Sequence, residues 1–225
     1  HTEIRVFSND PASIDTSPIL HLTNRKNIRA SAYDVYEKLL AAGHSEGDAM
    51  NAEAFLAFCS LLDEPYEFVD NEAFSHFAEN QQQITISINL AAWLFNHFRN
   101  SRFRVHMADK KLLAGAAGSF LYTDLFVTRA EASQSRNFFE EALLAVEVLN
   151  GAAMAFERGS RFPLFTRVPA LCEYVTIDAQ NQQVRIWRRE GSRWVEYEPS
   201  SPPGELNLES LGVTIPATVL FANIS

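Results

Sequence analysis

The 225-residue chain lacks several features that are typical of particular classes of protein. It has no apolar run long enough to cross a bilayer, which excludes a membrane-spanning helix. Its two cysteines, Cys59 and Cys172, are far apart and have no Cys or His neighbours at zinc-ligand spacing, so they fit two reduced thiols better than a disulfide framework or a zinc site. We expect a cytoplasmic protein, and we expect His1 to be a processed end or a tag remnant, not the start of a signal peptide.

The chain also lacks an excess of basic residues. Its net charge of −9 argues against a nucleic-acid partner, because phosphate binding favours basic surfaces. The charge is unevenly distributed: residues 1–80 contain 5 basic and 14 acidic residues (−9), whereas residues 81–225 contain 14 of each (0). The excess therefore belongs to the first third, where a solvated acidic surface or a segment that binds another protein would each explain it.

Histidines at metal-ligand spacing are absent as well. The six histidines are scattered along the chain, and we interpret them as surface or core residues: His1, His21, His44, His76, His97 and His106.

What is present is a chain with 47% hydrophobic residues, enough to bury one substantial core. We predict an acidic, partly irregular N-terminal extension with helical character over residues 1–49, and one domain over residues 50–225. Periodicity and turn residues predict helices from Ser31, from Asn51, over Ile84–Phe98 and over residues 154–167, a hairpin over Tyr66–Phe74, and strands at Phe103–Met107, residues 120–129, residues 142–150, Glu173–Asp178, Val184–Arg189 and Arg193–Glu198. The fold class is α/β, a mixed sheet flanked by helices.

Two of these strands each carry an acid in an apolar setting. Asp124 lies in FLYTDLFVTR and Glu147 lies in ALLAVEVLN. Burying a lone carboxylate costs several kcal/mol unless it is compensated, so a shared cation would explain both. The alternative is that one or both acids point outward from half-exposed strands.

A divalent ion such as magnesium prefers oxygen ligands. Asp124, Glu147 and the carbonyl of Val148 could supply them from adjacent strands. A metal held in this way can activate a bound water and neutralise charge on a phosphodiester, which is the chemistry of hydrolytic nucleases.

Seven stretches of the chain are similar, in order and spacing, to the motifs of one bacterial family. They are YEFVDNE at 66–72, RVHMADKK at 104–111, TDLFV at 123–127, VEVLN at 146–150, ERGSRFPLF at 157–165, VPALCEYVTID at 168–178 and LESLGVTIP at 208–216. By these motifs, residues 50–221 resemble the Uma family of restriction endonucleases, a branch of the PD-(D/E)xK nuclease superfamily. The resemblance implies a restriction-endonuclease-like mixed β-sheet core, hydrolysis of DNA, and magnesium or manganese as cofactor.

The same resemblance implies roles for single residues. Asp124 matches the family's strand acid, Glu147 the acid of its second motif, and Glu67 a helper acid on the hairpin. Arg161 stands where members usually have a lysine, and we expect it to contact the scissile phosphate. The implied metal ligands are Asp124, Glu147, Val148 and Glu67.

The chain departs from the family at five places. Thr123 replaces the proline before the first acid, Leu149 the superfamily lysine, Arg161 the helix lysine, Asn80 a histidine, and residues 150–153 a Ser-Pro-Ser-Thr run. Arginine is permanently protonated and cannot exchange a proton as lysine can. Two hypotheses follow: a nuclease of low activity, or a nuclease-fold protein that lost catalysis and acts as a binding or assembly module.

Two clusters of basic residues are candidates for contact with DNA. The first contains Arg102, Arg104, Lys110 and Lys111 beside Arg99, and ordinary strand-edge charges would look the same. The second, around Trp187 and Trp194, we interpret as one wet face of a hairpin. A symmetric pair of subunits is the expected assembly, because it is the commonest one and suits cutting of both strands.

Overall fold

The computed structural model describes residues 5–7, 55–56, 66–69, 72–75, 80–107, 110–115, 118–132, 138–149, 161–197 and 205–224. Among these residues, no helix is both long enough and apolar enough to span a bilayer.

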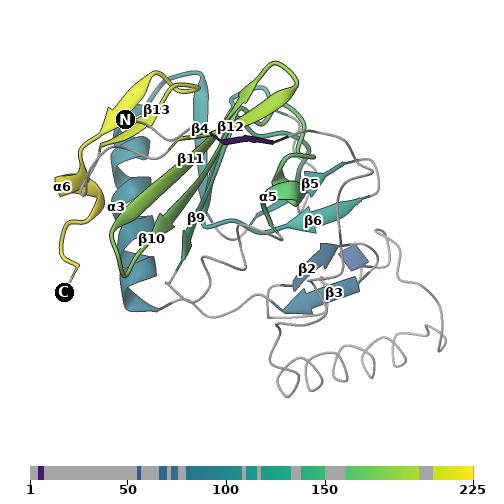
Figure 1. The fold of residues 1–225 in the computed structure, drawn as a ribbon, viewed down its shortest axis with the longest axis horizontal. Helices are drawn as coiled ribbons and strands as arrows, with labels where there is room; N and C mark the ends of the chain where they lie inside the picture. Colours follow the sequence, from purple (N-terminus) through teal and green to yellow (C-terminus); the bar gives the residue numbers. More distant parts are fainter. Residues whose placement is uncertain are drawn as a thin grey trace.

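Seven strands form the main sheet, in the spatial order β1-β12-β11-β10-β9-β7-β4 (Figure 1). In that order they are Arg5–Phe7, Arg193–Tyr197, Gln183–Glu190, Glu173–Asp178, Leu144–Leu149, Leu125–Arg129 and Phe103–Met107. All neighbours are antiparallel except β9 and β10. A parallel pair requires a crossover connection. The described part of that connection contains Arg161 and the single-turn helix α5 (Phe162–Phe165).

A second sheet lies beside the first, in the order β3-β2-β6-β5-β8 (Figure 1). Its strands are Glu72–Ser75, Tyr66–Val69, Ser119–Leu121, Lys111–Ala114 and Phe138–Phe139. The β2–β3 hairpin confirms the hairpin predicted from residues 66–74. Strands β13 (Leu206–Leu208) and β14 (Val213–Ile215) form a separate hairpin.

The long helix α3 (Gln81–His97) confirms the helix predicted over residues 84–98 and covers one face of the main sheet (Figure 1). A capping box starts it: the Asn80 side chain accepts from the Gln83 amide at 3.0 Å, and Gln83 Oε1 accepts from Asn80 N at 3.1 Å. Asn80, which replaces the family's histidine, therefore caps the helix. The short helix α6 (Ala217–Leu220) is tied to α3 because Asn89 donates to the Leu220 carbonyl at 3.1 Å.

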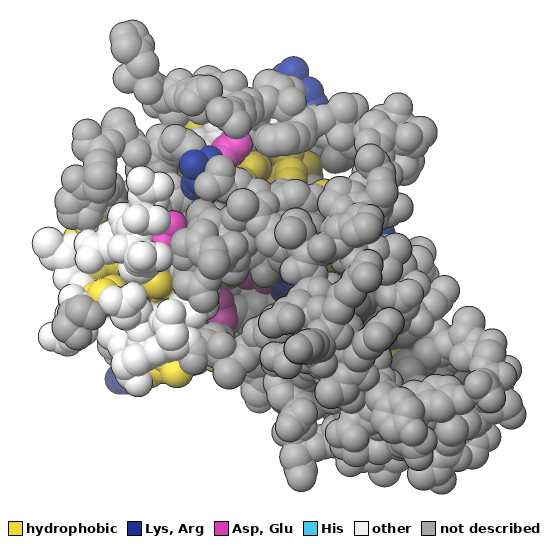
Figure 2. All heavy atoms as spheres, turned by 60° about the horizontal axis from the view of Figure 1, so that its bottom comes forward, with side chains coloured by type: hydrophobic (Ala, Val, Ile, Leu, Met, Phe, Trp, Pro, Cys, Tyr) yellow, Lys and Arg dark blue, Asp and Glu magenta, His cyan; other side chains and the backbone are white. Residues whose placement is uncertain are grey.

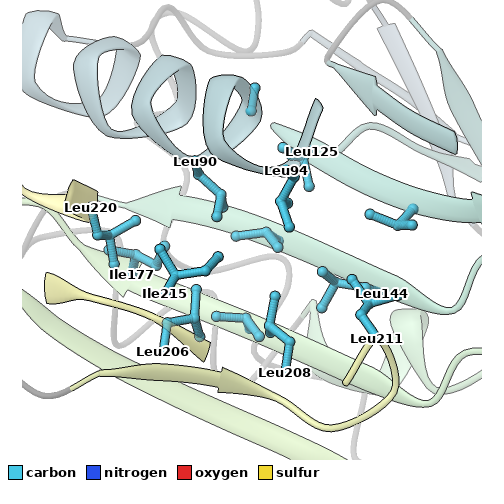
Figure 3. Packing of buried hydrophobic residues seen from close by; sticks show 14 of the residues in the cluster. Leu90, Leu94, Leu125, Leu144, Ile177, Leu206, Leu208, Leu211, Ile215 and Leu220 are labelled. Atoms are coloured by element: carbon cyan, nitrogen blue, oxygen red, sulfur yellow. The ribbon is translucent and has the colours of Figure 1, made fainter. Parts of the chain in front are cut away.

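The main sheet separates two hydrophobic clusters. On one face, Leu90 and Leu94 of α3 pack toward Leu125, Leu144 and Ile177, together with the β13–β14 hairpin (Figure 3). The other face carries a cluster rich in aromatic side chains, which we call the aromatic cluster; it includes Phe126, Ala145, Phe162, Phe165, Tyr174, Trp187 and Trp194. Side chains alternate between the two faces of a strand. On β9, Val146 and Val148 belong to the first cluster and Ala145 to the second, so Glu147 is directed toward the aromatic side.

One strand prediction was wrong. Residues 120–129 do not form a single strand, because Phe120 and Leu121 pair with β5 in the small sheet, while residues from Leu125 onward pair with β4 and β9 in the main sheet. Tyr122 connects the two sheets, and side chains bond its backbone: its N–H donates to Glu67 Oε1 at 2.7 Å and its carbonyl accepts from Arg161 at 2.7 Å.

Other predictions are corrected or stay open. Residues 5–7, which belong to the extension predicted as partly irregular, form an edge strand on β12. Within its described part, the helix predicted over residues 154–167 is the single turn α5. The helix predicted from Ser31, nearly all of the helix predicted from Asn51 and the rest of the N-terminal extension lie outside the described residues, so the division at residue 49 remains a prediction.

Cys172 is a free thiol next to the start of β10, and burial raises its pKa above the ordinary value. A raised pKa means less thiolate at a given pH, and the thiolate is the reactive form. In a Cys59→Ser variant at pH 8, we therefore expect Cys172 to react more slowly with iodoacetamide in the folded protein than in urea. The reaction is measured by mass spectrometry, and equal alkylation rates in the folded protein and in urea would contradict this prediction.

Candidate active site

Glu147 lies in the middle of β9 and is 4% exposed. Its Oε2 accepts a hydrogen bond from the hydroxyl of Tyr174, a buried residue on the neighbouring strand β10. Tyr174 is fixed in turn by stacking on Phe165, with ring centroids 4.6 Å apart. One oxygen of Glu147 is thus held by a residue of the aromatic cluster, and the carboxylate orientation is fixed from inside the protein.

Asp124 directly precedes β7 and is 7% exposed. Its Oδ2 accepts a hydrogen bond from the Val148 N–H at 2.5 Å. The preceding residue, Thr123, donates its hydroxyl to the Val146 carbonyl, also at 2.5 Å. These two bonds fasten Thr123 and Asp124 to β9 on either side of Glu147. The alternative that these acids point outward into solvent is wrong. Thr123, where the family has proline, makes one of the two bonds.

Glu67 comes from the hairpin of the small sheet and is 7% exposed. Its Oε1 accepts a hydrogen bond from the Tyr122 N–H at 2.7 Å. Tyr122 is the residue at which the chain leaves the small sheet. This bond connects β2 to the segment that carries Asp124.

Arg161 links the two glutamates. Its Nε donates to Glu147 Oε1 at 2.7 Å, and its Nη1 contacts Glu67 Oε2 at 2.5 Å. Nη2 lies 3.0 Å from Glu67 Oε1, 2.5 Å from Glu147 Oε1 and 2.7 Å from the Tyr122 carbonyl. The guanidinium carbon lies 5.5 Å from the centroid of the Phe165 ring. The structure therefore gathers Glu67, Glu147 and Arg161 at one point, with Asp124 bonded to the residue after Glu147.

The donor set suits a hard divalent cation in type and in charge. Carboxylate and carbonyl oxygens are the ligands that magnesium and manganese prefer, and three carboxylates with one guanidinium carry a formal charge of −2. Two observations limit the fit. The Val148 carbonyl accepts from Gln83 Nε2 at 2.7 Å. Within the described ranges, no group of three or more His, Cys, Asp or Glu side chains is arranged to hold a metal. The oxygen ligands are of the type that the ion prefers, but Arg161 is bonded to both Glu67 and Glu147, where the ion would bind.

The four basic residues predicted to contact nucleic acid lie on different sheets. Arg102 and Arg104 are exposed, just before and on β4 of the main sheet. Lys110 and Lys111 belong to the β5 region of the small sheet, and Lys111 is buried, with its Nζ 5.0 Å from the Tyr122 ring centroid. On the face shown in Figure 2, the coloured Lys and Arg side chains are scattered rather than gathered. That these residues contact DNA remains a prediction.

Three contributors to the site were not anticipated from the sequence: Thr123 as a hydrogen-bond donor, Gln83 and Tyr174. Gln83 is 65 positions from Val148, and Tyr174 is 27 positions from Glu147. The one available signal was the polar Gln83 on the buried side of an apolar helix, which suggests a partner for its amide.

The fold is an α/β fold, with a mixed sheet flanked by helices. A crystal structure described as a putative nuclease belonging to DUF820 from Anabaena variabilis has the same fold: the TM-score is 0.60 at 13% identity, covering 77% of this chain and 98% of that one. This likeness confirms the predicted fold class.

The family is shown by the sequence. The family model Uma2, described as "Putative restriction endonuclease", matches residues 52–218, and the chain belongs to this family. Two relatives from Synechocystis, the uncharacterized proteins slr1290 and sll1609, are 21% and 22% identical. The matched regions cover 78% and 67% of this chain, and 93% and 87% of the relatives.

Proposed function

We propose that the protein is a metal-dependent endonuclease that hydrolyses phosphodiester bonds of DNA in the cytoplasm. The observation that carries the proposal is that Glu67 and Glu147, from two different sheets, both bond to the Arg161 guanidinium. Beside them, Asp124 is bonded to the Val148 N–H. Buried carboxylates need a compensating charge, and a divalent cation can supply that charge as well as a guanidinium can. Structural ion pairs also occur, so the test has to measure both metal binding and chemistry.

Each residue has a part in the proposed reaction. Asp124, Glu147 and Glu67 would hold magnesium or manganese, together with the Val148 carbonyl, which also accepts from Gln83 and has two lone pairs. When bound, the ion supplies positive charge and Lewis acidity at the scissile phosphate. Tyr174 keeps Glu147 oriented. Arg161 binds the phosphate through its planar fork of N–H donors.

A second candidate function is binding or assembly without catalysis. The observation that favours it is the absence of lysine at the two motif positions: the side chain at 149 is a buried leucine, and 161 is a permanently charged arginine. In this case the acidic first third is the proposed segment for a protein partner. In both cases a symmetric dimer is the proposed assembly.

One experiment separates the two candidates. The full chain is titrated with manganese by calorimetry, and supercoiled plasmid is then incubated with protein and manganese, with an excess of EDTA as control. We expect manganese binding and metal-dependent conversion to nicked circles. Metal binding without nicking would leave the binding module as the function. Nicking that EDTA does not suppress would exclude metal dependence.

A further inference from the structure

The acid cluster already holds a cation from its own chain. Among the described residues, the Arg161 guanidinium contacts both oxygens of Glu67 and one oxygen of Glu147, whose other oxygen accepts from Tyr174. The Arg161 side chain is only 13% exposed, and those of Glu67 and Glu147 are 9% and 5% exposed. Arg161 is therefore a largely desolvated counter-ion of two acids that were expected to bind metal.

We propose that Arg161 and the divalent cation compete for Glu67 and Glu147, so that the guanidinium closes the cluster until a metal ion displaces it. The inference rests on the proposed metal site. It adds a regulatory step: the protein holds its site in a metal-free, charge-compensated state, and metal binding releases Arg161.

The competition follows from charge and geometry. A guanidinium and a divalent ion on the same carboxylate oxygens would be a few ångströms apart, and their repulsion is poorly screened in a buried setting. Arg161 bonds to Oε1 of Glu147 and to both oxygens of Glu67, so an ion bound to these two glutamates would have to share those oxygens with the guanidinium. Occupancy by one cation therefore disfavours the other.

Displacement would also supply the phosphate contact. Once released from the glutamates, the Arg161 fork is free to bond an oxyanion, which it cannot do while the acids hold it. The guanidinium carbon also lies 5.5 Å from the Phe165 ring centroid and Nη2 donates to the Tyr122 carbonyl, and neither contact involves the glutamates. Arg161 can therefore exchange the glutamates for another partner without a relocation of the chain. Metal and DNA would then favour each other's binding.

The chain contains a matched ion pair for comparison. Arg188 on β11 has a side-chain exposure of 12% and donates through Nε to buried Glu173 at 2.8 Å. Glu173 is otherwise held by the backbone amides of Glu209 and Ser210. Glu209, the second acid at Arg188, is largely exposed, so replacing this arginine tests the loss of a buried pair without touching the candidate site.

The test is manganese calorimetry on the full chain for the wild type, Arg161→Met and Arg188→Met. We expect at least about tenfold tighter manganese binding in Arg161→Met and unchanged binding in Arg188→Met. Equal affinity in the wild type and Arg161→Met would overturn the competition but leave the proposed nuclease standing. Absence of binding in both would overturn the competition and the metal dependence together.

A second measurement uses the unmodified protein, in case Arg161→Met does not fold. In proton–nitrogen NMR spectra of the wild type, the Arg161 Nε–H, bonded to Glu147, is assigned through correlations to its own side-chain carbons. Titration with magnesium is expected to shift this signal or broaden it through solvent exchange, while the Arg188 Nε–H stays unchanged. An Arg161 signal that does not move at saturating magnesium would overturn the proposal.

Discussion

Replacing Asp124 with Asn is expected to lower manganese-dependent plasmid nicking by at least about 10²-fold, equivalent to a barrier increase of about 3 kcal/mol. Asn has the same shape and can still accept the Val148 N–H through its amide oxygen, so the bond that fastens this segment to β9 can survive. The negative charge is lost, and a neutral amide oxygen is a much poorer ligand for a hard divalent ion. The expected loss is therefore one of chemistry, with the fold retained.

The control for this variant is Asp178→Asn. Asp178 is also buried, on β10 of the same sheet, where it caps a turn by accepting from the amides of Gln180 and Asn181, each at 3.0 Å. Its replacement is expected to leave nicking unchanged within about threefold, because Asp178 bonds to its own turn, where the oxygen of Asn can still accept a hydrogen bond. Nicking that persists in Asp124→Asn would point to a contaminating nuclease and would remove this residue from the mechanism.

Replacing Glu173 with Ala is expected to lower the free energy of unfolding by about 3–5 kcal/mol. Glu173 is 1% exposed and accepts from Arg188, from the Glu209 N–H at 3.1 Å and from the Ser210 N–H at 2.9 Å. Its removal leaves a largely buried guanidinium and two backbone donors without this acceptor. Because those donors lie in the turn between β13 and β14, that hairpin is expected to loosen first.

Urea denaturation of the variant measures the first expectation, and amide hydrogen exchange in Val213–Ile215 measures the second. Glu190→Ala is the matched control, since Glu190 is exposed and its side chain bonds to the hydroxyl of Tyr197. We expect a change below about 0.5 kcal/mol there. A similarly small change in Glu173→Ala would show that the Glu173 network contributes little net stability.

The helices and strands that could be predicted were those with a clear local period. The predicted strand Glu173–Asp178 matches β10 to the residue, and Phe103–Met107 matches β4. In β10 both faces are buried, whereas in β4 buried Phe103 and Val105 alternate with exposed Arg104, and each pattern is typical of a strand. The prediction over residues 120–129 failed because a continuous apolar run carries no sign of where the chain changes sheets. Pairing with β5 or with β4 decides that, and both strands are elsewhere in the sequence.

The acids of the candidate site were predictable for a similar reason. Asp124 and Glu147 stand out because each interrupts an apolar run, and their burial follows from those neighbours. The cation that compensates Glu147 could not be predicted from spacing. A guanidinium and a metal ion meet the same electrostatic need, and only the folded chain shows that Arg161 reaches Glu147 and Glu67 together.

The sequence by itself determined the fold class, the family and the identity of the three acids, because composition, periodicity and motif order are local properties of the chain. Tertiary structure decided which residues join them: Arg161 between two glutamates, Tyr174 on Glu147, and Gln83 on the Val148 carbonyl. The physical reason is that hydrogen bonds and ion pairs depend on distances of about 3 Å in space, whereas the partners are tens of residues apart along the chain.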